Sequence, residues 1–202
     1  MASAELRNVA IDAASYFSDI RVPATFLAGS AVGGLFTMKS NQQQLKTMPR
    51  VEYWVRIVYT FLMFTTFLLS MNTAIMASSA FLTTKNTAVY NPMATSAFEL
   101  LVREFNYELT ITRWSYEISM ISFIVAIMLR LLLEFDAFDK AAPRRRKSFA
   151  AAILLFTSSL AAHLMSFINT RMYQFKSIGA LTIEVVKLVA GKNLKGHPLA
   201  AL

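Results

Sequence analysis

Ser148-FAAAILLFTSSLAAHLMSF-Ile168 is the stretch that decides the fold. Its twenty-one residues include no Asp, Glu, Lys or Arg, and His163 carries the only side chain among them that can become charged near neutral pH. Because an α-helix rises about 1.5 Å per residue, a helix of this length covers the ~30 Å hydrocarbon core of a bilayer. The stretch therefore predicts a membrane-spanning helix.

Three further apolar stretches precede it in the chain. Residues 55–82 and 112–135 are long enough to span, whereas residues 22–38 number only seventeen, at the lower limit for a spanning helix. We therefore expect an all-α, polytopic membrane protein with about four transmembrane helices, the first one short. The whole chain, 1–202, is expected to form a single integral-membrane domain.

An amphipathic segment precedes these spans, and another follows them. Residues 4–20 place apolar side chains on one helical face, and their acidic residues argue against a secretory signal or a mitochondrial transit peptide. Residues 172–194 carry a second apolar stripe, opposite lysines: Ile178, Leu181, Val185, Leu188 and Val189 against Lys176, Lys187 and Lys192. Such a helix lies in the membrane interface or packs as an ordinary helix, and the sequence leaves both readings open.

Composition and charge narrow the class of protein. Hydrophobic residues make up 55% of the chain and charged residues 16%, against about a quarter charged in a soluble domain. The net charge of +8 is concentrated at the ends of the apolar stretches, as in the run Arg144-Arg-Arg-Lys147, which indicates membrane topology and not nucleic-acid binding. The expected partners are membrane lipids and either other integral-membrane subunits or copies of the same chain.

Motifs of catalysis are missing from the sequence. There is no cysteine, no phosphate-binding glycine loop, no His-Glu-x-x-His and no Gly-x-Ser-x-Gly. We therefore expect no catalytic residues, no metal site and no enzymatic activity.

The first apolar stretch contains a Gly-x-x-x-Gly step formed by Gly29 and Gly33, with Gly34 and Thr37 close behind. Small residues at this spacing allow two helix backbones to approach closely in lipid. The step predicts a close-packed face. Its counterpart is a helix of the same chain, a helix of another subunit, or the lumen of a pore.

A polar seam follows the second stretch, because Thr65, Asn72 and Ser79 recur every seven residues. Hydroxyl and amide groups on such a stripe form hydrogen bonds to a neighbouring helix, each contributing about 0.6 kcal/mol in a bilayer. The alternative is a conduction or ligand path.

Two membrane charges, Glu117 and Arg130, lie in the third stretch. They are thirteen residues apart, ~20 Å along a helix, so each is expected near one membrane interface, where it reaches the headgroups or pairs with another residue. Such residues are functional candidates by default, but this position favours anchoring.

His163 lies in the middle of the clean fourth stretch. A neutral imidazole there requires a partner, and three remain open: a buried hydrogen bond, for instance with Asn72, a pigment such as chlorophyll, or a proton or ion. A haem held by two histidines of this chain is not expected, since the only other one is His197, in the C-terminal tail. The cofactor is therefore unknown, with chlorophyll, another pigment or lipid as candidates.

The order of these features resembles that of the Orai calcium channels. The resemblance covers about positions 20–175 and rests on Arg21-x-x-Ala-x-x-Leu-Ala-Gly29, Glu108-Leu and Ala161-Ala-His163. It implies a pore lined by the first helices of several subunits. The acidic selectivity residue of that family is missing here, with Thr37 near its position, so the resemblance does not imply calcium selectivity. The 98–139 block also resembles uncharacterised four-helix membrane proteins of algae and related protists, which implies no function.

Two functions follow as expectations. The first is a non-catalytic accessory or structural subunit of a larger membrane complex, photosynthetic or respiratory, in the thylakoid or mitochondrial inner membrane and not the plasma membrane. The second is a homo-oligomeric ion channel of Orai-like architecture with residues 22–38 at its axis.

Overall fold

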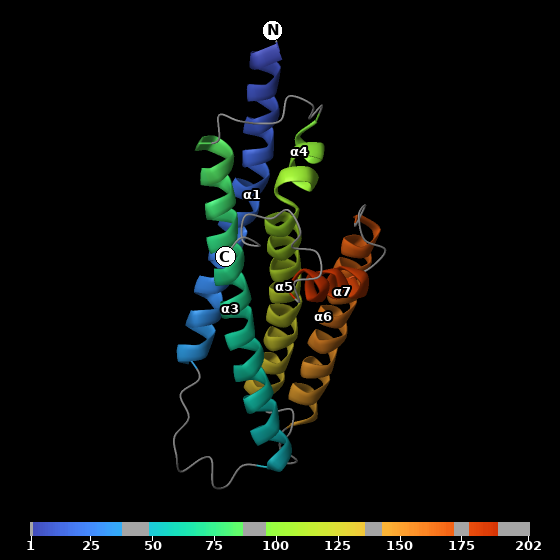
Figure 1. Cartoon of the computed structure of the whole chain (residues 1–202). Helices are drawn as coiled ribbons and strands as arrows, with labels where there is room; N and C mark the ends of the chain where they lie inside the picture. The colour runs from blue at the N-terminus through green and yellow to red at the C-terminus, as the bar shows by residue number, and fades with distance from the viewer. Residues whose placement is uncertain (1, 38–48, 87–95, 136–142, 172–177, 190–202) are drawn as a thin grey trace. The chain divides into compact units, whose positions relative to one another are not determined.

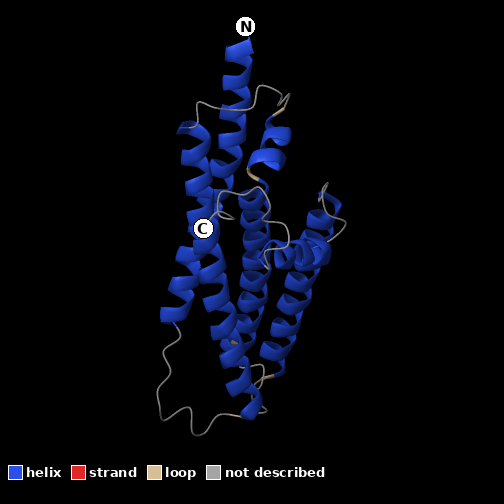
Figure 2. Ribbon diagram, viewed as in Figure 1, coloured by secondary structure: helices blue, strands red, loops and turns tan. Residues whose placement is uncertain are grey.

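The computed structural model describes residues 2–37, 49–86, 96–135, 143–171 and 178–189. Within these ranges the regular structure is entirely helical, without strands, which confirms the all-α class for this part of the chain (Figures 1 and 2). The helices are α1 (Ala2–Thr37), α3 (Arg50–Asn86), α4 (Ala97–Glu104), α5 (Asn106–Glu134), α6 (Arg144–Arg171) and α7 (Ile178–Val189).

Helix α1 is continuous where the sequence predicts two segments, 4–20 and 22–38. It runs through Pro23, which lacks an N–H and so removes only one hydrogen bond of the helical ladder. Ala24, Leu27 and Ala28, which follow Pro23, have high helix propensity. The N-terminal amphipathic face and the first apolar stretch therefore belong to one helix that ends at Thr37.

Among the described residues, three helices are long and apolar enough to cross a membrane: residues Val9–Thr37 of α1, Arg50–Lys85 of α3 and the whole of α5. They indicate a membrane protein. The fourth predicted span, 148–168, falls on α6, but several of its side chains beyond His163 lie outside the described residues. The count of four spans therefore stays a prediction.

The helices form two compact units, each with its own packing. Unit 1 comprises Met1–Thr25, Met71–Tyr116 and Asn169–Leu202, and unit 2 comprises Phe26–Ser70 and Glu117–Ile168.

The core of unit 1 is built on the apolar face of the first half of α1. Phe17 is fully buried, and its ring meets Phe105 edge-on at 6.1 Å between centroids. The other members are small or branched side chains of α1, α3, α4 and α5: Ala13, Ala77, Ala80, Leu100, Leu101 and Leu109. The short helix α4 is capped by Ser96, whose hydroxyl accepts a hydrogen bond from the Glu99 N–H at 3.2 Å.

Helix α7 also packs in unit 1. Leu181, Val185 and Leu188 are buried, and the Trp114 indole N–H of α5 donates to the Thr182 hydroxyl at 3.0 Å. Three residues of the predicted apolar stripe are thus used for internal packing along α7, whereas Val189 is 66% exposed. Residues 172–177 and 190–194 of that segment, with Lys176 and Lys192, lie outside the described residues.

The core of unit 2 joins the second half of α1 to α3 and α5. Its buried members are Ala31, Tyr59, Met63 and Ala126. Ala31 and Ala126 are small, so the larger Tyr59 and Met63 of α3 fill the space beside them. This core fixes the end of α1 that carries the predicted glycine step.

Candidate helix-packing site on α1

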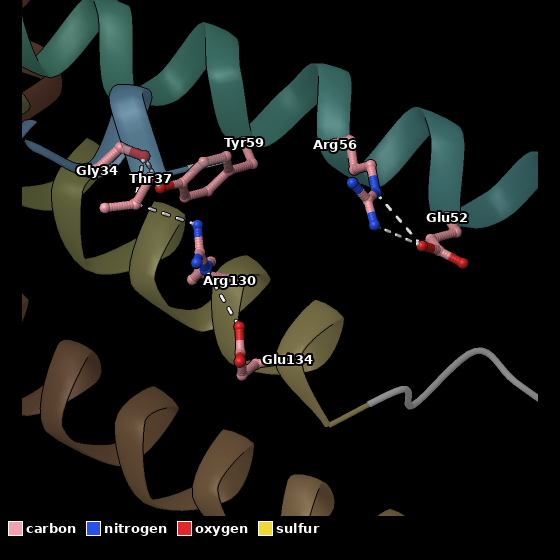
Figure 3. Close-up of polar contacts among 7 residues, drawn as sticks. All are labelled: Gly34, Thr37, Glu52, Arg56, Tyr59, Arg130 and Glu134. Carbon is pink, nitrogen blue, oxygen red and sulfur yellow. Dashed lines mark hydrogen bonds and ion pairs between the residues drawn. The ribbon is translucent and has the colours of Figure 1, made fainter. Parts of the chain in front are cut away.

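Gly34 is the glycine of α1 that packs against the protein's own helices (Figure 3). A Cβ added at Gly34 lies 2.2 Å from Met63 Cε and 3.1 Å from the Tyr59 hydroxyl. That hydroxyl donates a hydrogen bond to the Gly34 carbonyl at 3.0 Å. The absence of a side chain at Gly34 therefore lets α3 approach the backbone of α1 closely.

Arg130 of α5 lies at the C-terminal end of α1 (Figure 3). Its guanidinium donates to the Thr37 hydroxyl at 3.5 Å, pairs with Glu134 at 3.6 Å and lies 6.0 Å from the centre of the Tyr59 ring. The last carbonyls of a helix carry partial negative charge, so a cation at this point is favourable. Arg130 anchors the end of α1, and the predicted site residue Thr37 is one of its contacts.

Gly29 and Gly33 lie on a different face of α1, which the described helices leave open. Both glycines are exposed, and a Cβ added at either meets no described atom within 4 Å. Two large side chains lie next to the step on the same face, Phe26 at 73% and Phe36 at 80% exposure. We call Phe26, Gly29, Gly33 and Phe36 the open face of α1. Between its two exposed aromatic side chains, this face carries no side chain at Gly29 and Gly33.

The predicted seam of α3 lies beside the stripe that α3 buries. Thr65 is half-buried, and Asn72 and Ser79 are exposed. In unit 1 the Asn72 amide donates to the Ser115 hydroxyl of α5 at 2.9 Å, which is a helix-to-helix contact of the expected kind. The buried stripe itself runs one position further along the chain: Thr66 and Ser70 in unit 2, and Thr73, Ala77, Ala80 and Thr84 in unit 1.

Helix α5 contributes matching hydroxyls that the sequence did not single out. Thr112 and Ser115 are fully buried in unit 1, and Ser119 is fully buried in unit 2. In unit 2 the Thr66 hydroxyl donates to the Leu62 carbonyl at 2.8 Å and lies 3.4 Å from the Ser119 carbonyl. The spacing of three and four residues between these α5 hydroxyls is the signal that was available.

The remaining predicted residues lie apart from the open face. Glu117 is 7% exposed, so the chain's own helices cover it, and its expected position near a membrane interface stays a prediction. His163 is exposed on α6, and Asn72 uses its amide for Ser115. Among the described residues, no group of three or more His, Cys, Asp or Glu side chains could hold a metal ion.

Comparisons of the chain with protein-family models, with curated proteins and with solved structures find no match. The resemblance to Orai channels therefore stays a prediction from short sequence motifs.

Proposed function

We propose that this protein is a non-catalytic, integral-membrane accessory subunit that binds a helix of a different subunit through the open face of α1. The observation that carries the proposal is that Gly29 and Gly33 are exposed and meet no described atom, although they form the small-residue step typical of close helix contacts. In lipid, such a step stabilises a protein only where another helix packs on it.

The shape of the open face supports a helix as the ligand. Lipid tails are as apolar as leucine, so apolar character alone does not favour protein over lipid at this face. A rigid helix, however, gains dispersion contacts when one of its large side chains packs over Gly29 and Gly33. A flexible lipid tail at the same place loses conformational freedom, so the helix is favoured over lipid.

The aromatic flanks favour a partner of different sequence. In a two-fold symmetric pair of parallel helices that cross at Gly33, Phe26 and Phe36 would each lie close to their own copies. Bulky side chains at both ends would then hold the backbones apart, which opposes the close approach that the glycines allow. A partner with small residues opposite Phe26 and Phe36 and a large residue opposite the glycines complements this face.

The same residues give less support to the channel alternative. A channel with α1 at its axis needs a wetted lumen, and polar or charged side chains usually line one. The open face instead presents two exposed phenylalanines and contains no ionisable side chain. These side chains fit a protein contact better than an aqueous path.

The exposed imidazole of His163 adds a second point of contact. An exposed imidazole on α6 is available to a pigment or to a polar group of a neighbouring subunit. We propose that it serves the complex and not the interior of this chain. An absorption spectrum of the purified complex, compared between wild type and His163→Leu, tests whether a pigment is bound there.

Native mass spectrometry of the protein extracted gently from its source membrane tests the main proposal. We expect wild type to co-purify with subunits of other masses, and Gly33→Val to be released as a folded chain of 22.6 kDa. Ala151→Val, which adds the same side chain at an exposed position of α6, is the control and should keep its partners. Wild type that appears only as multiples of 22.6 kDa, with no other subunit, overturns the accessory-subunit proposal in favour of self-association.

A further inference from the structure

A hollow of about 590 Å³ lies in unit 2, where α5 ends and α6 begins. Glu134, Phe135, Arg145, Arg146 and Phe149 line it. The rings of Phe135 and Phe149 meet edge-on at 5.0 Å between centroids. The hollow therefore combines two guanidinium groups with an aromatic wall.

The electrostatics of the hollow favour an anion. Arg145 and Arg146 belong to the first turn of α6, where the helix macrodipole is positive. Among the described residues that line the hollow, Glu134 is the only acidic one, and it pairs with Arg130 at 3.6 Å. The balance of charge among the lining residues is positive.

An apolar track continues from the hollow along α6. Phe149, Phe156 and Leu160 are 55%, 73% and 46% exposed, and their spacing of seven and four residues places them on one face of the helix. From Phe149 to Leu160 this face runs ~16 Å, about half of the ~30 Å hydrocarbon core of a bilayer. The track thus has the length of one leaflet.

We propose that this region binds one anionic phospholipid, with the phosphate on Arg145 and Arg146 and an acyl chain along Phe149, Phe156 and Leu160. Guanidinium groups bind phosphate oxygens through two parallel hydrogen bonds, and basic pockets at the ends of membrane helices suit anionic headgroups. The hollow alone would also accept a free phosphate ion, but the exposed apolar track selects a ligand that carries a long hydrocarbon chain.

Lipid binding by the full-length, detergent-solubilised chain tests this site. Native mass spectrometry with added phosphatidylglycerol, phosphatidylcholine or inorganic phosphate measures which probe is retained. We expect wild type to retain phosphatidylglycerol in preference to both other probes. Arg145→Gln should weaken this binding about tenfold, as expected for the loss of a charge-assisted hydrogen bond.

The matched control is Arg144→Gln, which removes the same charge one residue earlier, outside the lining of the hollow. It should change phosphatidylglycerol binding by less than about threefold, since only long-range attraction is lost. Equal weakening by both variants, or equal retention of phosphatidylcholine by wild type, overturns the headgroup site. Equal retention of inorganic phosphate overturns the role of the acyl track.

A thermal unfolding series separates this site from a purely structural role. If Arg145 instead stabilises the packing of the chain itself, Arg145→Gln lowers the melting temperature by the same amount in phosphatidylcholine and in phosphatidylglycerol, which contradicts the proposal. We expect a loss of stability confined to phosphatidylglycerol, because only that lipid binds the native state. The lipid site depends on the chain lying in a membrane but not on a partner subunit. Failure of the accessory-subunit proposal would therefore leave the lipid-site proposal intact.

Discussion

Two adjacent glycines of α1 meet opposite surroundings. Gly34 faces Met63 and Tyr59 at distances that leave no room for a side chain, whereas Gly33, one residue earlier, faces no described atom within 4 Å. A single step along a helix rotates the side-chain direction by about 100°. The comparison teaches that one small-residue cluster combines an internal contact at Gly34 with an exposed position at Gly33, where we propose that a second helix binds.

The largest expected difference in stability lies between these two positions. Gly34→Val forces Met63 and Tyr59 to move and should lower the free energy of unfolding by about 1–3 kcal/mol, the usual cost of overpacking. Gly33→Val adds the same side chain on the open face and should change the free energy of unfolding of the isolated chain by less than about 0.5 kcal/mol. Unfolding in mixed detergent measures both. Equal losses of stability would remove the distinction between the two faces.

Arg130 of α5 provides a second test of the internal contacts that hold the C-terminal end of α1. Arg130→Met removes the cation at the end of α1 and over the Tyr59 ring, so we expect a loss of about 1–2 kcal/mol in the free energy of unfolding. Arg130→Lys keeps the charge and should recover part of it. No recovery would mean that the planar guanidinium, and not the positive charge, holds this end of α1.

A smaller effect is expected at the Tyr59 hydroxyl. Tyr59→Phe removes the hydrogen bond to the Gly34 carbonyl and keeps the ring, so about 1 kcal/mol of stability should be lost. The same substitution should leave binding of the partner subunit unchanged, since Tyr59 is buried away from the open face. Loss of the partner at unchanged stability would show that the two faces are not independent.

The smallest effect concerns a contact in unit 1 that involves neither glycine. A double-mutant cycle with Asn72→Leu and Ser115→Ala should give a coupling energy of about 0.6 kcal/mol, the typical value for a hydrogen bond between membrane helices. This value gives the scale for one internal contact. A coupling energy near zero would mean that the Asn72–Ser115 bond adds nothing to the internal packing.

Much of the helical fold could be predicted from apolar length alone. The stretch 55–82 falls within α3, and 112–135 falls on α5 apart from its last residue, because a long, predominantly apolar run has few alternatives to a helix in lipid. The continuity of α1 could not be predicted, since Pro23 breaks many helices and tolerance depends on the residues around it.

The packing residues of the site were harder to predict, because two adjacent rows of α3 both carry hydroxyl groups. The seven-residue repeat favours the seam Thr65, Asn72 and Ser79, whereas the buried row includes Thr66 and Thr73 together with the apolar Ala77 and Ala80. Close helix packing selects small side chains whether or not they are polar. For the same reason, the sequence located the glycine cluster but could not assign Gly34 to the interior and Gly33 to the open face.

Photo-cross-linking in the native membrane tests the open face most directly. A p-benzoylphenylalanine in place of Phe36 keeps an aromatic ring on that face, and the same replacement at Phe61, an exposed phenylalanine of α3, is the control. The account predicts that position 36 yields an adduct with a protein of a different sequence and that position 61 yields only lipid adducts. An adduct of twice 22.6 kDa at position 36, or no protein adduct there, would contradict it.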